Sequence, residues 1–334
     1  ARALTNLAPG MVTLVTGATG LLGNNVVRNL LEQGTAVRVL ARDNSDARPF
    51  AGLEIQMARG DMRDRDAVSR AVEGVSCVIH AAGYVHIGWR GLEQAREINV
   101  EGTRHIAEAA RAAGAKFVHV SSLDALGPSE PGRPNDEETP RTGGVPCPYV
   151  VTKREGEQVI LDLVAGGLDA RIVNPGYMIG PYDWKPSSGR MLLQVAKGWA
   201  LFAPLGANCY CDVRDVATGI VMAAERGSPG RRYILAGPSL SYFQAWRIFA
   251  KATGGTPPLF PAGPIVRIAA GLVGDMVTKI TGREPDVNSA ATAVAAQRRN
   301  FTSARAEREL GYRPRPLLES ATDAWHWFRQ NGYV

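Results

Sequence analysis

Short apolar runs alternate with segments of helical periodicity along the first half of the chain. Buried strands are predicted for the apolar, largely β-branched runs at residues 12–16, 36–41, 53–57, 76–81, 116–121 and 170–173. Between them, apolar residues recur on one face of predicted helices at 22–33, 64–72, 92–113 and 149–164. Because helices that join parallel strands cover both faces of the sheet, this alternation predicts an α/β fold with a doubly wound parallel sheet of the Rossmann type.

The pattern changes after residue 175. Proline, glycine and aromatic residues there separate short elements, and helices are predicted at 216–225, 242–251, 265–280, 303–310 and 319–330. We therefore expect a loose N-terminal extension (1–10), a Rossmann domain (11–175) and a smaller, mostly helical region (176–334), some segments of which return to the Rossmann core. Six prolines between Pro128 and Pro148 predict a long surface loop, and loops of that length usually serve a function.

Composition and charge exclude several classes of protein. The 334 residues include 38 Lys and Arg against 32 Asp and Glu, but the excess is spread along the chain, which argues against nucleic-acid binding. Four cysteines without a CxxC pattern predict a reduced, cytoplasmic protein with no metal site. The apolar segment at 265–280 contains three charged residues and is too short for a membrane span, so it is interpreted as an amphipathic helix.

A glycine-rich loop follows the first predicted strand. Gly17, Gly20 and Gly23 lie in the string TGATGLLG, at the point where the first helix begins. Gly17 permits a tight turn, Gly20 lets the backbone approach a ligand, and Gly23 permits close helix packing, while the helix N-terminus offers free N–H groups to a diphosphate. A glycine triplet alone would also fit a simple turn, but the strand and helix around it predict a dinucleotide site.

Residues after the second and third strands bear on the choice of cofactor. Where a protein that prefers NAD has a carboxylate for the ribose hydroxyls, this chain has Ala41, followed by Arg42. A guanidinium matches a 2′-phosphate in charge and shape, so the sequence predicts NADP(H), although Arg42 could also be a solvated loop residue beside Asp43. Asp61 is interpreted either as an acceptor for the adenine amine or as the N-cap of the helix at 64–72.

Tyr149 and Lys153 lie four residues apart and therefore share one face of a predicted helix. A cation beside a phenol favours the phenolate, so we expect the pKa of Tyr149 to be lowered towards neutrality. Ser121 and Ser122 end the fifth strand, at the edge of the sheet where parallel sheets bind their ligands. The alternative to a catalytic role is that Tyr149 and Lys153 are an ordinary pair on a helix surface and that the serine only caps the end of the strand.

Six motifs in order give this chain its resemblance to a known family. They are TGATGLLG, HAAG (80–83), NVEGT (99–103), HVSS (119–122), YVVTK (149–153) and NPG (174–176). Together they resemble the extended short-chain dehydrogenase/reductase family, within the NAD-dependent epimerase/dehydratase superfamily. The string VRVLARD places the closest resemblance in the branch of the dihydroflavonol reductases and 3β-hydroxysteroid dehydrogenases.

The resemblance implies roles for individual residues. Tyr149 would be the acid/base, Lys153 would lower its pKa and hold the nicotinamide ribose, and Ser122 would hydrogen-bond the reacting oxygen. Further cofactor contacts would come from Thr19, Leu21, Leu22, Met62, Ala81, Ala82, Asn99 and Pro175. Relatives often form homodimers through helices that correspond to 92–113 and 149–164.

Three reactions remain open from the sequence. Dehydratases of the family carry an acid pair where this chain has Leu123 and Asp124, and epimerases tend to have an acid in place of Ala41. A non-catalytic cofactor-binding sensor would usually have lost Tyr149 or Lys153. The resemblance therefore favours an oxidoreductase that transfers hydride between NADP(H) and the carbonyl or secondary alcohol of a small apolar or aromatic compound.

Two segments are expected to contact that substrate. They supply mostly aromatic and apolar side chains, with Asp124 as a further candidate, and the set is Tyr84, His86, Trp89, Asp124, Tyr177, Met178, Trp184 and Met191. A nucleotide-sugar would instead require cations for its diphosphate. The alternative is that these aromatic residues only pack the smaller region.

Overall fold

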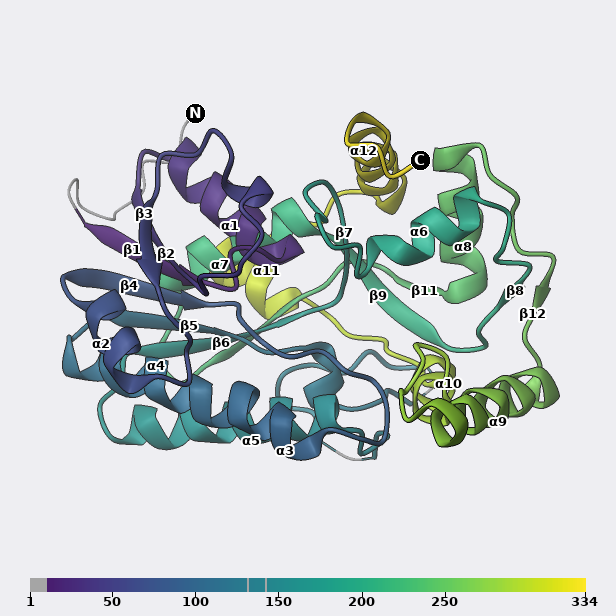
Figure 1. The fold of residues 1–334 in the computed structure, drawn as a ribbon, viewed down its shortest axis with the longest axis horizontal. Coiled ribbons are helices and arrows are strands. Elements are labelled where there is room, and N and C mark those ends of the chain that lie inside the picture. Colours follow the sequence, from purple (N-terminus) through teal and green to yellow (C-terminus); the bar gives the residue numbers. More distant parts are fainter. Residues whose placement is uncertain (1–10, 131, 142) are drawn as a thin grey trace.

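The computed structural model describes residues 11–130, 132–141 and 143–334. Seven parallel strands form the main sheet in the order β10-β6-β5-β4-β1-β2-β3 (Figure 1). Their bounds are β1 (Val12–Thr16), β2 (Ala36–Ala41), β3 (Gln56–Arg59), β4 (Val75–His80), β5 (Lys116–Val120), β6 (Ala170–Pro175) and β10 (Arg232–Leu235). The order reverses direction between β1 and β4, as in a doubly wound sheet. The predicted fold class is confirmed.

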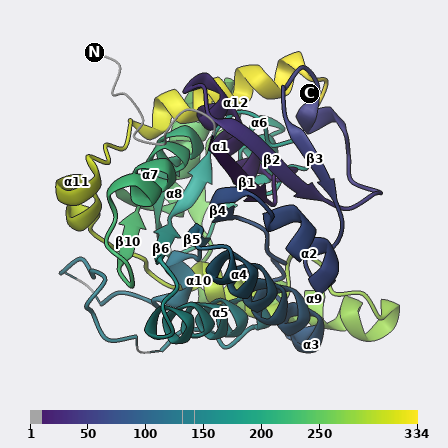
Figure 2. The same cartoon turned by 90° about the vertical axis from the view of Figure 1, so that its left-hand side faces the viewer.

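Helices cover both faces of this sheet (Figure 2). Successive strand residues point to opposite faces, so Val15 of β1 belongs to one apolar core and Leu14 to the other. On the Val15 side lie α1 (Leu21–Glu32), α7 (Val213–Arg226) and α11 (Ala304–Leu310). On the Leu14 side lie α2 (Arg65–Val72), α4 (Thr103–Ala112) and α5 (Pro148–Ala165).

Two predicted elements of this half differ from the structure. β3 spans Gln56–Arg59, although the sequence predicted a strand at 53–57. The helix predicted at 92–113 is divided into α3 (Leu92–Arg96), a π-helical turn (Glu97–Gly102) and α4. Met62 packs closely against the end of that turn. A Cβ added at Gly102 would lie only 2.6 Å from the Met62 Cε.

The region after residue 175 contains strands that the sequence analysis did not predict. β7 (Tyr177–Ile179), β9 (Ala207–Asp212) and β11 (Ser239–Ser241) form a second sheet, and β8 (Phe202–Ala203) pairs with β12 (Phe260–Pro261). Its helices are α6 (Gly189–Ala196), α8 (Tyr242–Thr253), α9 (Pro264–Thr281), α10 (Ser289–Ala296) and α12 (Leu317–Gln330). Aromatic residues of α8 and α12 form much of its core.

This region also contributes to the main sheet. β10 pairs with β6 as the seventh strand, and α7 packs closely on α1. The long loop at 128–148 is tied to the C-terminal half as well, since the Asn135 N–H donates to the Asn300 carbonyl at 2.8 Å.

Short 3₁₀ turns occur at Arg48–Phe50 and Leu123–Ala125. Within the described residues, no helix is long and apolar enough to cross a membrane. The extension predicted at 1–10 lies outside the described residues.

Candidate active site

Close packing of backbone shapes the glycine-rich loop between β1 and α1. Gly17 has φ +72°, and a Cβ there would lie 2.6 Å from the Ala82 nitrogen. A Cβ on Gly23 would lie 2.3 Å from the Gly17 carbonyl oxygen. Both positions therefore require glycine, and Ala81 and Ala82 lie directly against the loop. Their predicted contact with the cofactor stays a prediction.

The N-terminus of α1 is open to a ligand. Gly20 is the exposed N-cap, no side chain caps the helix, and its first turn contains no acidic residue. A Cβ on Gly20 would meet only the Gly17 carbonyl, at 3.3 Å. The Leu21 and Leu22 side chains are buried in the core, so only the backbone of these residues could bind a ligand, and Thr19 is half-buried beside them. This cradle fits the diphosphate of a dinucleotide.

The two residues predicted to read the adenosine half differ in their surroundings. Arg42 is exposed directly after β2, and no ion pair of its side chain occurs among the described residues. The Asp61 carboxylate is paired with Arg63 at 2.9 Å, and this hydrogen bond holds the pKa of Asp61 below its ordinary value. The interpretation of Asp61 as the N-cap of α2 is wrong, because Asp64 accepts the N–H groups of Asp66 and Ala67.

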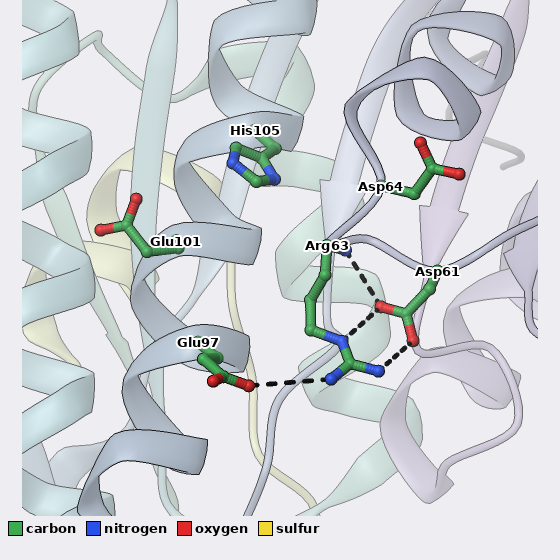
Figure 3. Close-up of a pocket in the computed structure, with 6 residues that line it drawn as sticks. All are labelled: Asp61, Arg63, Asp64, Glu97, Glu101 and His105. Atoms are coloured by element: carbon green, nitrogen blue, oxygen red, sulfur yellow. Dashed lines mark hydrogen bonds and ion pairs between the residues drawn. The ribbon is translucent and has the colours of Figure 1, made fainter.

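Asp61 and Arg63 are among the residues that line a hollow with polar side chains (Figure 3). Its wall includes Glu97 from the π-helical turn, whose carboxylate lies 3.7 Å from the Arg63 guanidinium. The rest of the lining comes from Asp64, Glu101 and His105. Met62 packs against the core on the Leu14 side of the sheet, and its carbonyl lies 3.3 Å from the His105 Nδ1.

Asn99 uses its side chain to hold the loop that follows β4. Its Oδ1 accepts the Tyr84 N–H at 2.7 Å, and its Nδ2 donates to the Tyr84 carbonyl and to the Thr152 hydroxyl, both at 2.9 Å. Both amide hydrogens are thereby used within the protein. The predicted direct contact of Asn99 with the cofactor stays a prediction, whereas its positioning of the loop is a feature of the structure.

Tyr149 and Lys153 lie in the first turns of α5. The Lys153 ammonium is buried, donates to the Val120 carbonyl at 2.9 Å, and lies 6.0 Å from the centre of the Tyr149 ring. A Cβ on Gly83 would lie only 3.3 Å from the same ammonium. The helix thus brings the phenol and the ammonium together at the carboxyl end of β5.

The expected lowering of the Tyr149 pKa is wrong for this structure. Burial raises the pKa of Tyr149, and the nearby Asp124 raises it further, while hydrogen bonding by Ser122 opposes them. Burial also lowers the pKa of Lys153 to about 8, because the ammonium has left water. Loss of solvation therefore outweighs the attraction that the Tyr/Lys spacing led us to expect.

The structure distinguishes the two serines at the end of β5. Ser121 donates to the buried carboxylate of Glu157, which also accepts from Asn174 at 2.7 Å. Ser122 instead accepts the Asp124 N–H at 3.1 Å and thereby caps the short turn at Leu123–Ala125. The Ser122 hydroxyl also donates to the Asp124 carboxylate at 3.3 Å and hydrogen-bonds Tyr149, so it lies beside the phenol, whereas Ser121 is bound to Glu157. The predicted contact of Ser122 with the reacting oxygen stays a prediction.

Arg299 lies beside this group and was missed by the sequence analysis. Its side chain is 3% exposed and forms an ion pair with Asp124. Burial opposes its charge, but Asp124 and the neighbouring phenols keep the pKa of Arg299 above its ordinary value. Asp124, predicted as a substrate contact, is thus a partner of Arg299. The pair RR at 298–299 carried no sequence signal for this role.

The loop after β4 is attached to the C-terminal region. His86 Nε2 lies 2.7 Å from the Glu284 carboxylate, which also accepts the Trp89 N–H at 2.8 Å. The Trp89 indole donates to Ser289 at 2.7 Å. Tyr84, His86 and Trp89 are only partly covered, so these predicted substrate contacts remain accessible.

The second predicted substrate segment is more deeply involved in packing. The ring of Trp184 meets the ring of Trp327 of α12 edge-on, with 5.0 Å between their centroids. The Tyr177 hydroxyl donates to the Ser188 carbonyl. Met191 belongs to the same core as Trp184, whereas Met178 packs against the core of the main sheet. Trp184 and Met191 therefore pack the C-terminal region, which was the alternative to substrate contact. Pro175 is the last residue of β6, directly before this segment.

A glycine-rich loop, a Tyr/Lys pair and a strand-end serine lie at one edge of this doubly wound sheet, an arrangement typical of nicotinamide-dependent enzymes. Residues 13–236 match the NAD dependent epimerase/dehydratase family, and the chain belongs to it. Its resemblance to the extended short-chain dehydrogenases/reductases is confirmed.

Several named proteins are similar to this chain. The "sterol demethylase protein B" of Methylococcus capsulatus is 34% identical over 97% of this chain and 100% of its own length. A "putative dihydroflavonol 4-reductase" of Synechocystis is 32% identical over 96% of this chain and 95% of its own. The crystal structure of gox2253 is 36% identical, with a TM-score of 0.84 over 97% of this chain and 99% of that one.

Proposed function

We propose that this protein is an NADP(H)-dependent oxidoreductase that interconverts the carbonyl and secondary alcohol of an apolar or aromatic compound. The observation that carries the proposal is the grouping of Tyr149, Lys153 and Ser122 at the carboxyl end of β5. The cofactor, when bound, supplies or accepts the hydride.

In the direction of reduction, the chain's own residues have distinct tasks. Tyr149, whose raised pKa keeps the phenol protonated, donates its proton to the carbonyl oxygen. Ser122 hydrogen-bonds the same oxygen and stabilises the charge that develops there. Lys153, fixed by the Val120 carbonyl, holds the nicotinamide ribose and stabilises the phenolate that proton donation leaves behind.

The preference for NADP(H) rests on the residues after β2. Ala41 is buried and contains no carboxylate, and Arg42 is exposed, without an ion pair among the described residues. A guanidinium in this position can pair with a 2′-phosphate through two hydrogen bonds. The missing carboxylate also argues against the alternative of an NAD-dependent epimerase.

The substrate class is supported by the relatives and by the loop after β4. Sterol, dihydroflavonol and 3β-hydroxysteroid occur in the names of similar proteins, and all three denote fused-ring compounds. We call Tyr149, Lys153 and Ser122 the Tyr149 group. Tyr84, His86 and Trp89 offer aromatic surface beside it. We therefore propose a flat, ring-containing carbonyl or alcohol as substrate. The proposed enzyme is a cytoplasmic homodimer that pairs through α4 and α5.

The test is NADPH consumption with a panel of 3-ketosteroids, dihydroflavonols and simple aromatic ketones. UDP-glucose is tested separately by product analysis with either cofactor present, because epimerisation consumes no NADPH. Turnover of a ring ketone supports the proposal, and Tyr149→Phe should then lower kcat by at least about a hundredfold while NADPH affinity stays unchanged. Conversion of UDP-glucose alone would favour the epimerase. Tight NADPH binding without turnover of any compound would favour the sensor.

Cofactor preference is tested separately with Arg42→Ala. Loss of a charge-assisted contact to the 2′-phosphate should weaken NADPH about tenfold or more and leave NADH nearly unchanged. Arg70→Ala, which removes an exposed arginine of α2, serves as the control. An equal loss for both cofactors would mean that Arg42 does not contact the 2′-phosphate.

A further inference from the structure

Helix α9 packs on the protein through its smallest residues. Gly271, Gly274 and Thr278 are its buried residues. A Cβ on Gly274 would lie 1.9 Å from the Val287 carbonyl, and one on Gly271 would lie 3.0 Å from the Ser289 Cα. The helix is therefore seated closely against the segment that leads into α10.

The large aliphatic residues of α9 face the opposite way. Ile265 is 84% exposed and Ile280 is 77% exposed, and the aliphatic residues between them that point the same way are 51% to 63% exposed. At 100° per residue these positions form one broad apolar stripe opposite the glycines, made of Ile265, Ile268, Leu272, Val273, Met276 and Ile280. A helix of a globular protein normally buries such a stripe, so this one is built to meet something other than water.

The apolar surface continues beyond α9. β12 leads into the helix and pairs with β8, where the exposed rings of Phe202 and Phe260 lie 6.2 Å apart. Trp199, just before β8, is 74% exposed, and the Lys197 ammonium lies 5.5 Å from its ring. In Figure 1, α9, β12 and β8 follow one another along a single edge of the molecule, and Figure 2 shows α9 projecting from it.

The charges around this surface are mostly positive. Lys197, Arg267, Lys279 and Arg283 lie within residues 197–205 and 256–283, where Asp275 is the single acidic residue. The Asp275 carboxylate is occupied, since it accepts the Ser289 N–H at 3.0 Å. Lys279 lies on the same side of α9 as the stripe, Lys197 lies beside Trp199 and Arg283 directly follows the helix, whereas Arg267 lies on the glycine side. Aliphatic and aromatic residues with cations at their edge suit the boundary between the acyl chains and the anionic headgroups of a bilayer.

We propose that this surface, which we call the α9 surface, binds anionic phospholipid membranes, with α9 lying in the plane of the interface. The helix does not cross the bilayer; its apolar stripe enters the acyl region while the cations contact phosphate groups. A protein partner would not require cations around an aliphatic stripe, and a second copy of this chain would present the same positive charge to it.

The α9 surface is connected to the loop beside the Tyr149 group. Glu284, three residues beyond α9, accepts hydrogen bonds from His86 and from the backbone of Trp89 and Arg90. An interface-bound α9 would therefore hold the proposed substrate loop next to the membrane, where a water-insoluble ring compound dissolves. Membrane binding itself does not depend on the proposed function.

The experiment is co-sedimentation of the whole chain with vesicles, which requires no substrate and no turnover. We expect binding to phosphatidylglycerol vesicles at least tenfold stronger than to phosphatidylcholine vesicles, and weaker binding at high salt. Leu272→Glu combined with Met276→Glu should lower binding more than tenfold, because each change places a charge where the stripe enters lipid. Lys279→Ala should lower it about fivefold.

The matched control changes two exposed apolar residues elsewhere, Met57→Glu with Val334→Glu, and should bind as the unchanged protein does. NADPH affinity and thermal midpoint verify that each variant is folded. Failure to sediment with either vesicle would overturn the proposal. So would equal binding to both lipids, or a lipid-free dimer that Leu272→Glu with Met276→Glu converts to a monomer.

Discussion

At the scale of single residues, the buried ammonium of Lys153 is the most costly feature of the site. Burial lowers its pKa from 10.5 to about 8, so at neutral pH the folded protein keeps a charge that water would solvate better. Its contact with the Val120 carbonyl compensates only in part. A group kept at such a cost is more consistent with chemistry than with stability.

Titration of Lys153 should be visible in the stability of the protein. Between pH 8 and 10.5 the unfolded lysine keeps a proton that the folded one has lost, so stability rises with pH in this window. Relative to Lys153→Met, the unfolding free energy of the unchanged protein should rise by on the order of 3 kcal/mol between those pH values. Urea unfolding at several pH values measures the difference, and comparison with the variant cancels the cysteines and tyrosines. A flat difference would contradict the lowered pKa.

Arg299 offers a second prediction at this scale. Removal of one partner from a buried ion pair leaves the other charge uncompensated, so Arg299→Met should lower the free energy of unfolding by about 3 kcal/mol. Because Asp124 also holds the turn that Ser122 caps, kcat should fall while NADPH affinity is retained. We therefore regard Arg299 as a positioning residue.

A double-mutant cycle separates this role from simple packing. Asp124→Asn combined with Arg299→Met should cost at least about 1 kcal/mol less than the sum of the single changes, since no charge is then left alone. Arg299→Lys should recover part of kcat. Additive losses in stability, or an unchanged kcat in Arg299→Met, would show that Arg299 has no positioning role.

At the scale of elements, the βα alternation of the first half was readable because most strands are rich in buried apolar residues, whereas β3, with the sequence QMAR, was predicted too early in the chain. β10 was not, since its sequence RYIL is only four residues long and begins with the second residue of an arginine pair. The division of the helix at 92–113 also carries no periodic signal, because a π-helical turn adds no proline or glycine break at its start. Tertiary contacts of Met62 and Asn99 accompany that turn.

The candidate site divides in the same way. Gly17, Tyr149 and Lys153 could be identified because their spacing along one element determines where they lie. Arg299 and Glu284 could not, since each meets the site through contacts with residues more than a hundred positions away. The predicted direction of the Tyr149 pKa was wrong because the degree of burial is a property of the assembled fold.

The packing of α1 on the glycine loop gives a prediction for an element. Gly23→Ala places a Cβ 2.3 Å from the Gly17 carbonyl, which must move α1 away from the loop. We expect a loss of about 1–3 kcal/mol of stability and a large loss of NADPH affinity. Gly34→Ala is the control, because Gly34 has φ +77° and no neighbour within 4 Å, so it should cost stability alone. Normal NADPH binding by Gly23→Ala would show that this contact does not shape the cradle.

At the scale of the whole molecule, the two halves of the chain share one sheet and one core. Val173 of β6 pairs with Tyr233 of β10, and the core on the α1 side includes Val216 and Ile220 of α7. The predicted division at residue 175 therefore runs between strands that are hydrogen-bonded neighbours. We expect the halves to fold as one cooperative unit.

A fragment of residues 11–175 tests this expectation. Without β10 and α7, the edge of β6 and the α1 side of the sheet would be exposed to water, so the fragment should aggregate or unfold without a cooperative transition. The whole chain should show a single urea transition that coincides by circular dichroism and by tryptophan fluorescence. A fragment that unfolds cooperatively and binds NADPH would instead establish residues 11–175 as an independent domain, and β10 would then be an addition to a sheet that is already stable.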